Sequence, residues 1–327
     1  MFFALTEDQQ EFAAAVRGYL AERFDLAAVR GVVEDTDGDG NPATLWKAAG
    51  EQGWLAVTVP EEFDGLGLGL VEAQVIARAL GAGVAPGPWR GTVLAAEAIR
   101  LAGTDEQKAT WLPRLAAGTA VGALAADRTL AVVEYGAIAD VVVTPDGLLV
   151  TGASSTPRGS YDGTVRLADL TGGTVEELAA APEIRSRAAV LVAADLVGIA
   201  REALTRTVAY DRERRQFGVP VGSFQSIKHT LADLHCTITM AEHAALYAAH
   251  AVEVGAEDAP LAVAVAKAKA GDAAVASTGA MIQYHGGIGY TWEHEAHLFY
   301  KRAKRLAGQW GDAEAHRARI AELTIGE

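Results

Sequence analysis

QYHGGIGY, residues 283–290, ends a long alanine-rich and helix-favouring run near the C-terminal end of the chain. Three of four successive positions in it are glycines, so a helix that reaches this segment should stop there. Glycine permits positive φ and a close backbone approach, and successive unobstructed N–H groups can hold an anion such as a pyrophosphate. Two interpretations stay open: a plain helix end with a turn, or a backbone surface that contacts a large, flat ligand.

A second segment upstream, DRERRQFGVP at residues 211–220 followed by SFQ at 223–225, favours the ligand interpretation. It places several arginines, a glycine and a proline between two stretches of helical character. We expect a connection between two helices here, with Ser223 as the N-cap of the second helix. A guanidinium in such a connection suits phosphate groups, because it is permanently charged and donates two parallel hydrogen bonds.

Together, YDRERRQFGVPVGSFQSIKHTLADL and QYHGGIGYTWEHEAHLFYKRAK resemble the C-terminal domain of the acyl-CoA dehydrogenases, flavoenzymes that introduce an α,β double bond into acyl-CoA thioesters. The N-terminal segments GWLAVTVPEEFDGLGLG and GTDEQKATWLPRLAAG resemble the helical domain of the same family. The resemblance implies a mainly α fold with a small β middle domain. We expect an N-terminal helical domain at 1–117, a shortened β domain at 118–181 and a C-terminal four-helix bundle at 182–327.

Local patterns agree with that division. Thr6 and Thr104 each open a capping-box sequence before an apolar helical periodicity. The run from Ala188 to Ala209 is apolar and alanine-rich, which predicts a buried bundle helix. We expect further helices at 45–52, 71–80, 92–101, from Asp258 to about His285, and at 293–306, and strands at 139–144, 147–151 and 164–170.

Composition limits the function classes. At 327 residues with a net charge of −14, the chain argues against a general nucleic-acid or membrane-surface binder. The only cysteine, Cys236, excludes an intrachain disulfide, and we expect it to be a small buried residue. No signal peptide and no uncharged run of about 18 residues is found, which predicts a soluble cytoplasmic protein. His243 and His250 lack acidic partners at ligand spacing, so no metal site is expected.

The resemblance also assigns cofactor contacts, residue by residue. Arg214 matches the arginine that reaches the FAD pyrophosphate of a neighbouring subunit, although a solvated arginine beside Glu213 is the alternative. The other positions that match contacts to the same dinucleotide are Gln216, Phe217, Gln283, Gly286 and Gly287, and Gln225 is a further candidate.

The residue that takes the α-proton of the substrate is missing. The family's usual glutamate falls on Trp310, and the alternative position used by some members falls on Ala188. Neither side chain can act as a general base. Only a shifted alignment would promote Glu183 or Asp312 to that role. The middle domain also lacks the family's segments that hold the flavin ring, and residues 118–181 contain no tryptophan.

These features resemble the short subunit of bacterial heterotetrameric acyl-CoA dehydrogenases, which completes the FAD site of a full partner. We therefore expect FAD as cofactor, an acyl-CoA of fatty acid or sterol side-chain degradation as substrate, and a homologous subunit as partner; a homo-oligomer stays open. Two alternatives are a purely structural subunit, and a flavin oxidase or monooxygenase on the same fold, which needs no α-proton base.

Overall fold

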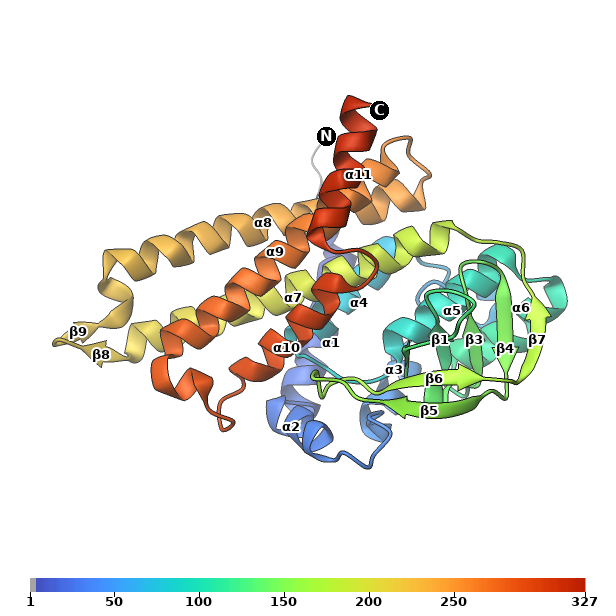
Figure 1. The fold of residues 1–327 in the computed structure, drawn as a ribbon, viewed down its shortest axis with the longest axis horizontal. Coiled ribbons are helices and arrows are strands. Elements are labelled where there is room, and N and C mark those ends of the chain that lie inside the picture. Colours follow the sequence, from blue (N-terminus) through green and yellow to red (C-terminus); the bar gives the residue numbers. More distant parts are fainter. Residues whose placement is uncertain (1–3, 327) are drawn as a thin grey trace. The chain divides into compact units, whose positions relative to one another are not determined.

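The computed structural model describes residues 4–326 and is mainly helical, with two small sheets and a short two-stranded hairpin (Figure 1). The chain divides into two compact units that are discontinuous in sequence. The first unit combines the chain up to Leu26, Gln74–Ala85 and the chain from Ala189 onward, and the second combines Ala27–Ala73 with Pro86–Ala188. The domain limits expected from the sequence stay a prediction.

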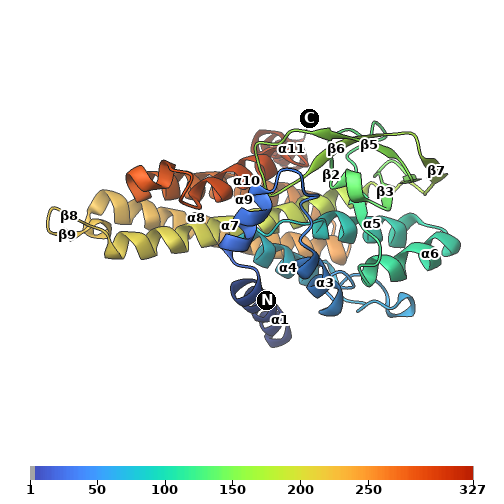
Figure 2. The same cartoon turned by 90° about the horizontal axis from the view of Figure 1, so that it is seen from below.

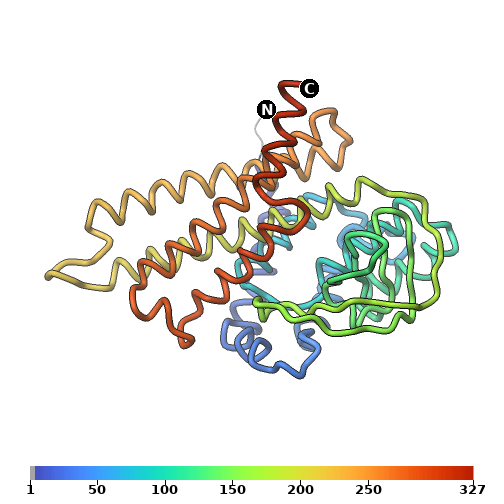
Figure 3. Tube along the Cα trace, in the orientation of Figure 1, coloured from blue at the N-terminus to red at the C-terminus, as the bar shows by residue number. Residues whose placement is uncertain are grey.

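Long helices build the first unit. They are α1 (Glu7–Arg23), the greater parts of α4 (Leu70–Ala82) and α7 (Glu183–Glu213), α8 (Gln225–Glu253), α9 (Ala259–His285), α10 (Ala296–Gly308) and α11 (Ala313–Ile325). Helix α9 packs against α8, α10 and α11. Figure 3 traces how α7 runs out to a hairpin turn, how α8 runs back from it, and how α9 runs beside them toward the hairpin end again. Every residue from Ala188 to Ala200 is buried, because α7 lies at the centre of this bundle.

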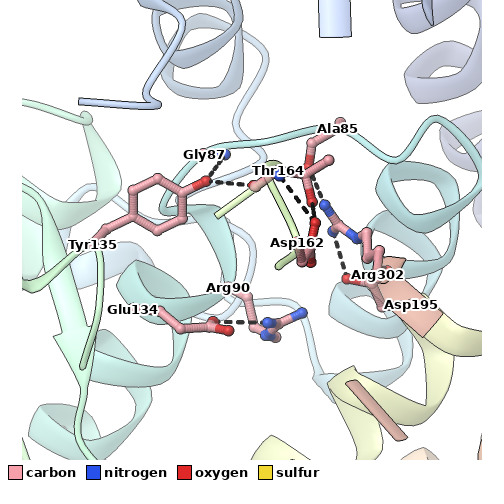
Figure 4. A network of polar contacts seen from close by, with 9 residues as sticks. All are labelled: Ala85, Gly87, Arg90, Glu134, Tyr135, Asp162, Thr164, Asp195 and Arg302. Atoms are coloured by element: carbon pink, nitrogen blue, oxygen red, sulfur yellow. Dashed lines mark hydrogen bonds and ion pairs between the residues drawn. The ribbon is translucent and has the colours of Figure 1, made fainter. Parts of the chain in front are cut away.

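A buried ion pair joins two helices of the first unit. The Arg302 guanidinium of α10 donates to both carboxylate oxygens of Asp195 on α7, at 3.2 and 2.7 Å, and to the carbonyl oxygen of Ala85 at 2.8 Å (Figure 4). Both charged side chains are almost fully buried. The carboxylate and the carbonyl together compensate the desolvation of the guanidinium, so the contact fixes α10 against α7.

The second unit carries the sheets and shorter helices. These helices are α2 (Leu26–Glu34), α3 (Ala43–Glu51), α5 (Trp89–Ala102) and α6 (Asp105–Ala116), with 3-10 turns η1 (Glu61–Phe63) and η2 (Gly136–Ile138). One sheet has the order β1 (Gly122–Leu124), β3 (Val141–Val143), β4 (Leu148–Thr151), β7 (Thr174–Glu177), with β1 and β3 parallel and the other pairs antiparallel. The other is antiparallel with the order β2 (Val133–Glu134), β6 (Leu167–Thr171), β5 (Ser154–Arg158).

Alternating inward residues of both sheets share one apolar core, and α5 covers β1 and β3. Polar contacts hold the loops beside it. The Tyr135 hydroxyl accepts a hydrogen bond from the Gly87 N–H at 2.6 Å and donates to the Thr164 carbonyl at 2.9 Å, and Arg90 pairs with Glu134 at 2.8 Å (Figure 4). The mainly α fold with a small β region is confirmed.

Most predicted elements are confirmed, and two local predictions are wrong. Both capping boxes form, at Thr6 and at Thr104. Ser223, however, is not an N-cap: its hydroxyl donates to the Pro220 carbonyl within a 3-10 turn, η3 (Val221–Ser223), and α8 begins after Phe224 without a side-chain cap. Cys236 is exposed, because it lies outside the buried stripe of α8. Helix α11 was not predicted at all.

Candidate dinucleotide-contact site

The connection between α7 and α8 is a tight β-hairpin. Strand β8 (Arg215–Gln216) pairs antiparallel with β9 (Val219–Pro220), and Phe217 and Gly218 form the turn with φ of 54° and 81°. Two successive positive φ angles are typical of the turn that matches the twist of a two-residue hairpin. This conformation turns Phe217 away from the chain, where 93% of its surface is exposed.

Arg214 stands at the base of this hairpin. Its N–H donates to the Tyr210 carbonyl at 2.8 Å, and its own carbonyl accepts from the Val221 N–H at 2.8 Å. Both ends of the loop are therefore fixed through the backbone of Arg214. Its side chain is exposed and makes no hydrogen bond or ion pair with the described part of the chain, so the guanidinium stays available for a charged group outside it.

The glycine-rich segment ends α9 as predicted, and its glycines have different roles. Gly286 has φ of 63°, and a 3-10 turn, η4 (Gly286–Tyr290), follows. A Cβ added at Gly289 would lie 2.6 Å from the Ile282 carbonyl oxygen, so this glycine is required for packing. A Cβ added at Gly286 or Gly287 would meet no atom within 4 Å. The backbone at these two positions is therefore open to a ligand from outside.

The structure brings the two motifs to one end of the bundle. Tyr210, one helical turn before Arg214, stacks on His285 with ring centroids 4.3 Å apart. Figures 1 and 2 both show the hairpin and η4 at the same end of α7, α8 and α9. The His285 ring is buried between α7 and α9, its Nδ1 lies 2.7 Å from the Met281 carbonyl oxygen, and burial is the main cause that lowers its pKa.

The remaining predicted contact residues are exposed. Gln216 donates its side-chain N–H to the Arg215 carbonyl at 2.8 Å, within the hairpin. Gln225 is the first residue of α8, and Gln283 lies in the last turn of α9, where its carbonyl accepts from the Gly286 N–H. Phe217 contacts Phe224 edge-on at 6.2 Å between ring centroids. All four side chains are therefore accessible from outside the chain.

Sequence reasoning missed two aromatic residues at this end of the bundle. Tyr290 is 89% exposed and Trp292 is 68% exposed, and the Lys301 ammonium lies 4.2 Å from the Trp292 ring centroid. Large aromatic side chains that are this exposed often belong to a surface that contacts a ligand or another chain. Their position directly after the glycines was the signal that could have identified them.

The two positions expected for the base carry no carboxylate. Ala188 is fully buried in α7. Trp310 is half-buried in the turn between α10 and α11, with φ of 56°. The buried Lys267 of α9 holds this turn by donating to the Ala307 and Gly311 carbonyls at 3.0 and 2.8 Å, and burial lowers the pKa of Lys267 to about 8.

The alternatives to those positions are not better placed. The Asp312 carboxylate accepts the Ala315 N–H at 2.8 Å and caps α11, which occupies it structurally. Glu183 is an exposed residue at the start of α7. Among residues 4–326, no cluster of histidine, cysteine and carboxylate residues suits a metal ion, and no helix is long and apolar enough to cross a membrane.

Comparison with known proteins identifies the class. Residues 6–119 match the N-terminal domain and residues 185–324 the C-terminal domain of acyl-CoA dehydrogenases. The chain belongs to the acyl-CoA dehydrogenase family. This membership confirms the predicted enzyme class, an FAD-dependent acyl-CoA dehydrogenase.

Individual relatives are similar over nearly the whole chain. The acyl-CoA dehydrogenase IpdE2 of Mycobacterium tuberculosis is 38% identical, over 91% of this chain and 91% of its own. The solved structure of a steroid acyl-CoA dehydrogenase variant, Tcur3481-Tcur3483, superimposes with a TM-score of 0.88 at 28% identity, over 98% of both chains. The ChsE4-ChsE5 complex of Mycobacterium tuberculosis has the same fold, with a TM-score of 0.88 at 24% identity, over 99% of both chains.

Proposed function

We propose that this chain is the subunit of a hetero-oligomeric acyl-CoA dehydrogenase that completes the FAD site of a homologous partner. The observation that carries the proposal is that Arg214 is unpaired and the backbone at Gly286 and Gly287 is open, while both expected base positions lack a carboxylate. Solved relatives that pair two such chains, Tcur3481-Tcur3483 and ChsE4-ChsE5, support a partner of the same family.

The residues at the end of the bundle fit the diphosphate half of FAD. Arg214 offers an unpaired, permanently charged guanidinium that can donate two hydrogen bonds to one phosphate. Gly286 and Gly287 allow a flat or anionic group to approach the backbone, because no side chain occupies that space. Phe217 supplies an exposed ring for stacking. Gln216, Gln225 and Gln283 can orient the remaining polar atoms.

When bound, FAD accepts the hydride that leaves the β-carbon of the acyl-CoA. Removal of the α-proton needs a carboxylate above that carbon, and neither Trp310 nor Ala188 offers one. We assign that step to the partner. The similarity to a steroid acyl-CoA dehydrogenase favours an acyl-CoA with a bulky sterol-derived group as the substrate.

The test is the FAD content of the co-purified pair after substitution of Arg214. Arg214→Ala should lower bound FAD about tenfold or more at limiting cofactor, and Arg214→Lys should retain part of it. Arg212→Ala is the matched control, because Arg212 is also exposed and lies two residues away at the end of α7, and its substitution removes the same charge. Full FAD content in Arg214→Ala would contradict the proposal.

The missing base also favours a second candidate, a structural subunit that does not touch FAD. In that case all three variants would retain the FAD of the pair, and the loss of this chain would affect only the stability of the partner. The Arg214 series therefore distinguishes the two candidates.

A further inference from the structure

Helices α4 and α7 cross in direct backbone contact. A Cβ added at Gly198 would lie 2.0 Å from the Arg78 carbonyl oxygen, and one added at Gly81 would lie 2.2 Å from the Asp195 carbonyl oxygen. No side chain fits between the two helices at these points, so the crossing is fixed by the glycines. Arg78 stands at the edge of this crossing.

A small pocket opens beside the crossing, within the first unit. Its volume is about 230 Å³, and its polar lining residues are Arg17 of α1, Arg78 of α4, Arg201 and Glu202 of α7, and Glu242 of α8. Pockets for drug-sized ligands start at about 300 Å³. This pocket therefore suits a small group, not a dinucleotide.

The carboxylates of the pocket are already paired with other arginines. Arg201 donates from Nε and Nη2 to the two oxygens of Glu242, at 3.0 and 2.6 Å. Glu202 accepts from Arg206 at 2.7 Å. The hydrogen bonds of both carboxylates thus go to Arg201 and Arg206, not to Arg17 or Arg78.

Two guanidinium groups of the pocket remain without a partner. Arg17 and Arg78 form no hydrogen bond and no ion pair with any residue in the described range 4–326. Arg78 is half-buried, and its pKa is lowered mainly by burial, an effect that Glu242 opposes and that Arg17 and Arg201 reinforce. Half-buried charged groups in folded proteins normally have hydrogen-bond partners. An oxyanion that enters the pocket can supply oxygens to the free N–H groups of Arg78.

We propose that Arg17 and Arg78 form a binding site for a phosphate-type oxyanion, either inorganic phosphate or a phosphomonoester. The planar forks of two guanidiniums match the oxygens of such an anion. No residue of this pocket belongs to the hairpin or to η4, so the site is separate from the dinucleotide contacts and does not depend on them.

The surroundings suggest how a monoester would be accommodated. A second hollow of about 350 Å³ shares Arg17 and Glu202 with the pocket. Its lining includes the apolar side chains Leu20, Phe24 and Leu26 and the charged side chains Asp25 and Arg206. An apolar, uncharged organic group fits this lining.

The test is calorimetric titration of the full chain, with its partner subunit where the two co-purify, at constant ionic strength. Inorganic phosphate should bind saturably, and both Arg17→Met and Arg78→Met should weaken binding about tenfold or more. Arg23→Met is the matched control: Arg23 is exposed on the same helix, outside both hollows, and the change in net charge is the same. Phenyl phosphate distinguishes the sources, since tighter binding than phosphate indicates a monoester.

Two results would overturn the site. One is a wild-type titration with phosphate that does not differ from a titration with chloride. The other is equal phosphate binding by Arg17→Met and Arg23→Met. Because Arg17 is exposed, its substitution should leave the fold intact, so the comparison decides the question even if Arg78→Met folds poorly.

Discussion

Replacing Asp211 by asparagine should stabilise the chain at neutral pH and have little effect in acid. Asp211 lies in the last turns of α7 and is only 1% exposed, and neither of its carboxylate oxygens has a hydrogen-bond partner in the described chain. It borders a pocket whose other lining includes the apolar residues Val208, Pro220 and Leu231 and the basic residues Arg212 and Lys228. Burial of the carboxyl group raises the pKa of Asp211 from 3.8 to about 6.

The size of the effect follows from that pKa. The folded chain holds the proton of Asp211 more tightly than the unfolded chain, so stability is gained below the unfolded pKa and lost as the pH rises towards the folded pKa. A difference of about two pKa units corresponds to about 3 kcal/mol in the free energy of unfolding. About 1.4 kcal/mol of this lies between about pH 5 and about pH 7.5. Asparagine is uncharged throughout and avoids this loss.

The assay is urea unfolding of the wild type, Asp211→Asn and Asp233→Asn at about pH 5 and about pH 7.5, at one protein concentration. Asp233 is an exposed carboxylate on α8 and serves as the matched control. The gain from Asp211→Asn should be larger at the higher pH by about 1.4 kcal/mol, and Asp233→Asn should show no such difference. An equal effect of Asp211→Asn at both pH values would refute the reasoning, because Asp211 would then titrate normally.

Three further substitutions test the packing and the contact surface. Asp195→Ala leaves Arg302 buried without its carboxylate and should lower the free energy of unfolding by about 3–5 kcal/mol in urea titrations; a loss below about 1 kcal/mol would contradict a buried pair. Gly198→Ala should destabilise by about 1–3 kcal/mol, because its Cβ would lie 2.0 Å from a carbonyl oxygen of α4, whereas Gly279→Ala, at an open position of α9, should stabilise by about 0.5–1 kcal/mol. If Gly198→Ala raised the melting temperature and Gly279→Ala lowered it, the backbones of α4 and α7 would not be in contact. Phe217→Ala should change the free energy of unfolding by less than about 0.5 kcal/mol, since the ring is 93% exposed. The same substitution should lower the FAD retained by the pair of subunits. Unchanged FAD retention would show that Phe217 is not one of the FAD contacts.

Local features were predictable because they depend on neighbours in the sequence. A capping box needs only residues three positions apart, and both predicted boxes form. The glycine-rich segment stops α9 because glycine, unlike other residues, adopts the required backbone angles readily. The prediction of Ser223 as an N-cap was wrong, because the Ser223 hydroxyl donates to the carbonyl of Pro220, three residues earlier. That hydrogen bond replaces the cap.

Contacts between distant residues were not predictable. Asp195 and Arg302 are 107 positions apart, and in the sequence Arg302 is one of several basic residues in a short run. The β8–β9 hairpin was not predicted, because its turn is Phe217-Gly218, whereas Asn-Gly is the usual sequence signal of a two-residue hairpin turn. The resemblance supplied the candidate contact residues. The stacking of Tyr210 on His285, which links the two motifs, joins residues 75 positions apart, and no local pattern encodes it.

The central claim is tested most directly by the FAD content of this chain purified alone and after co-expression with a full-length acyl-CoA dehydrogenase subunit. The account predicts little FAD in the chain alone and about one FAD per pair of chains in the complex, with acyl-CoA oxidation only in the complex. A chain that retains one FAD by itself and oxidises acyl-CoA would contradict the account, because it would have to contain a base that neither Trp310 nor Ala188 provides.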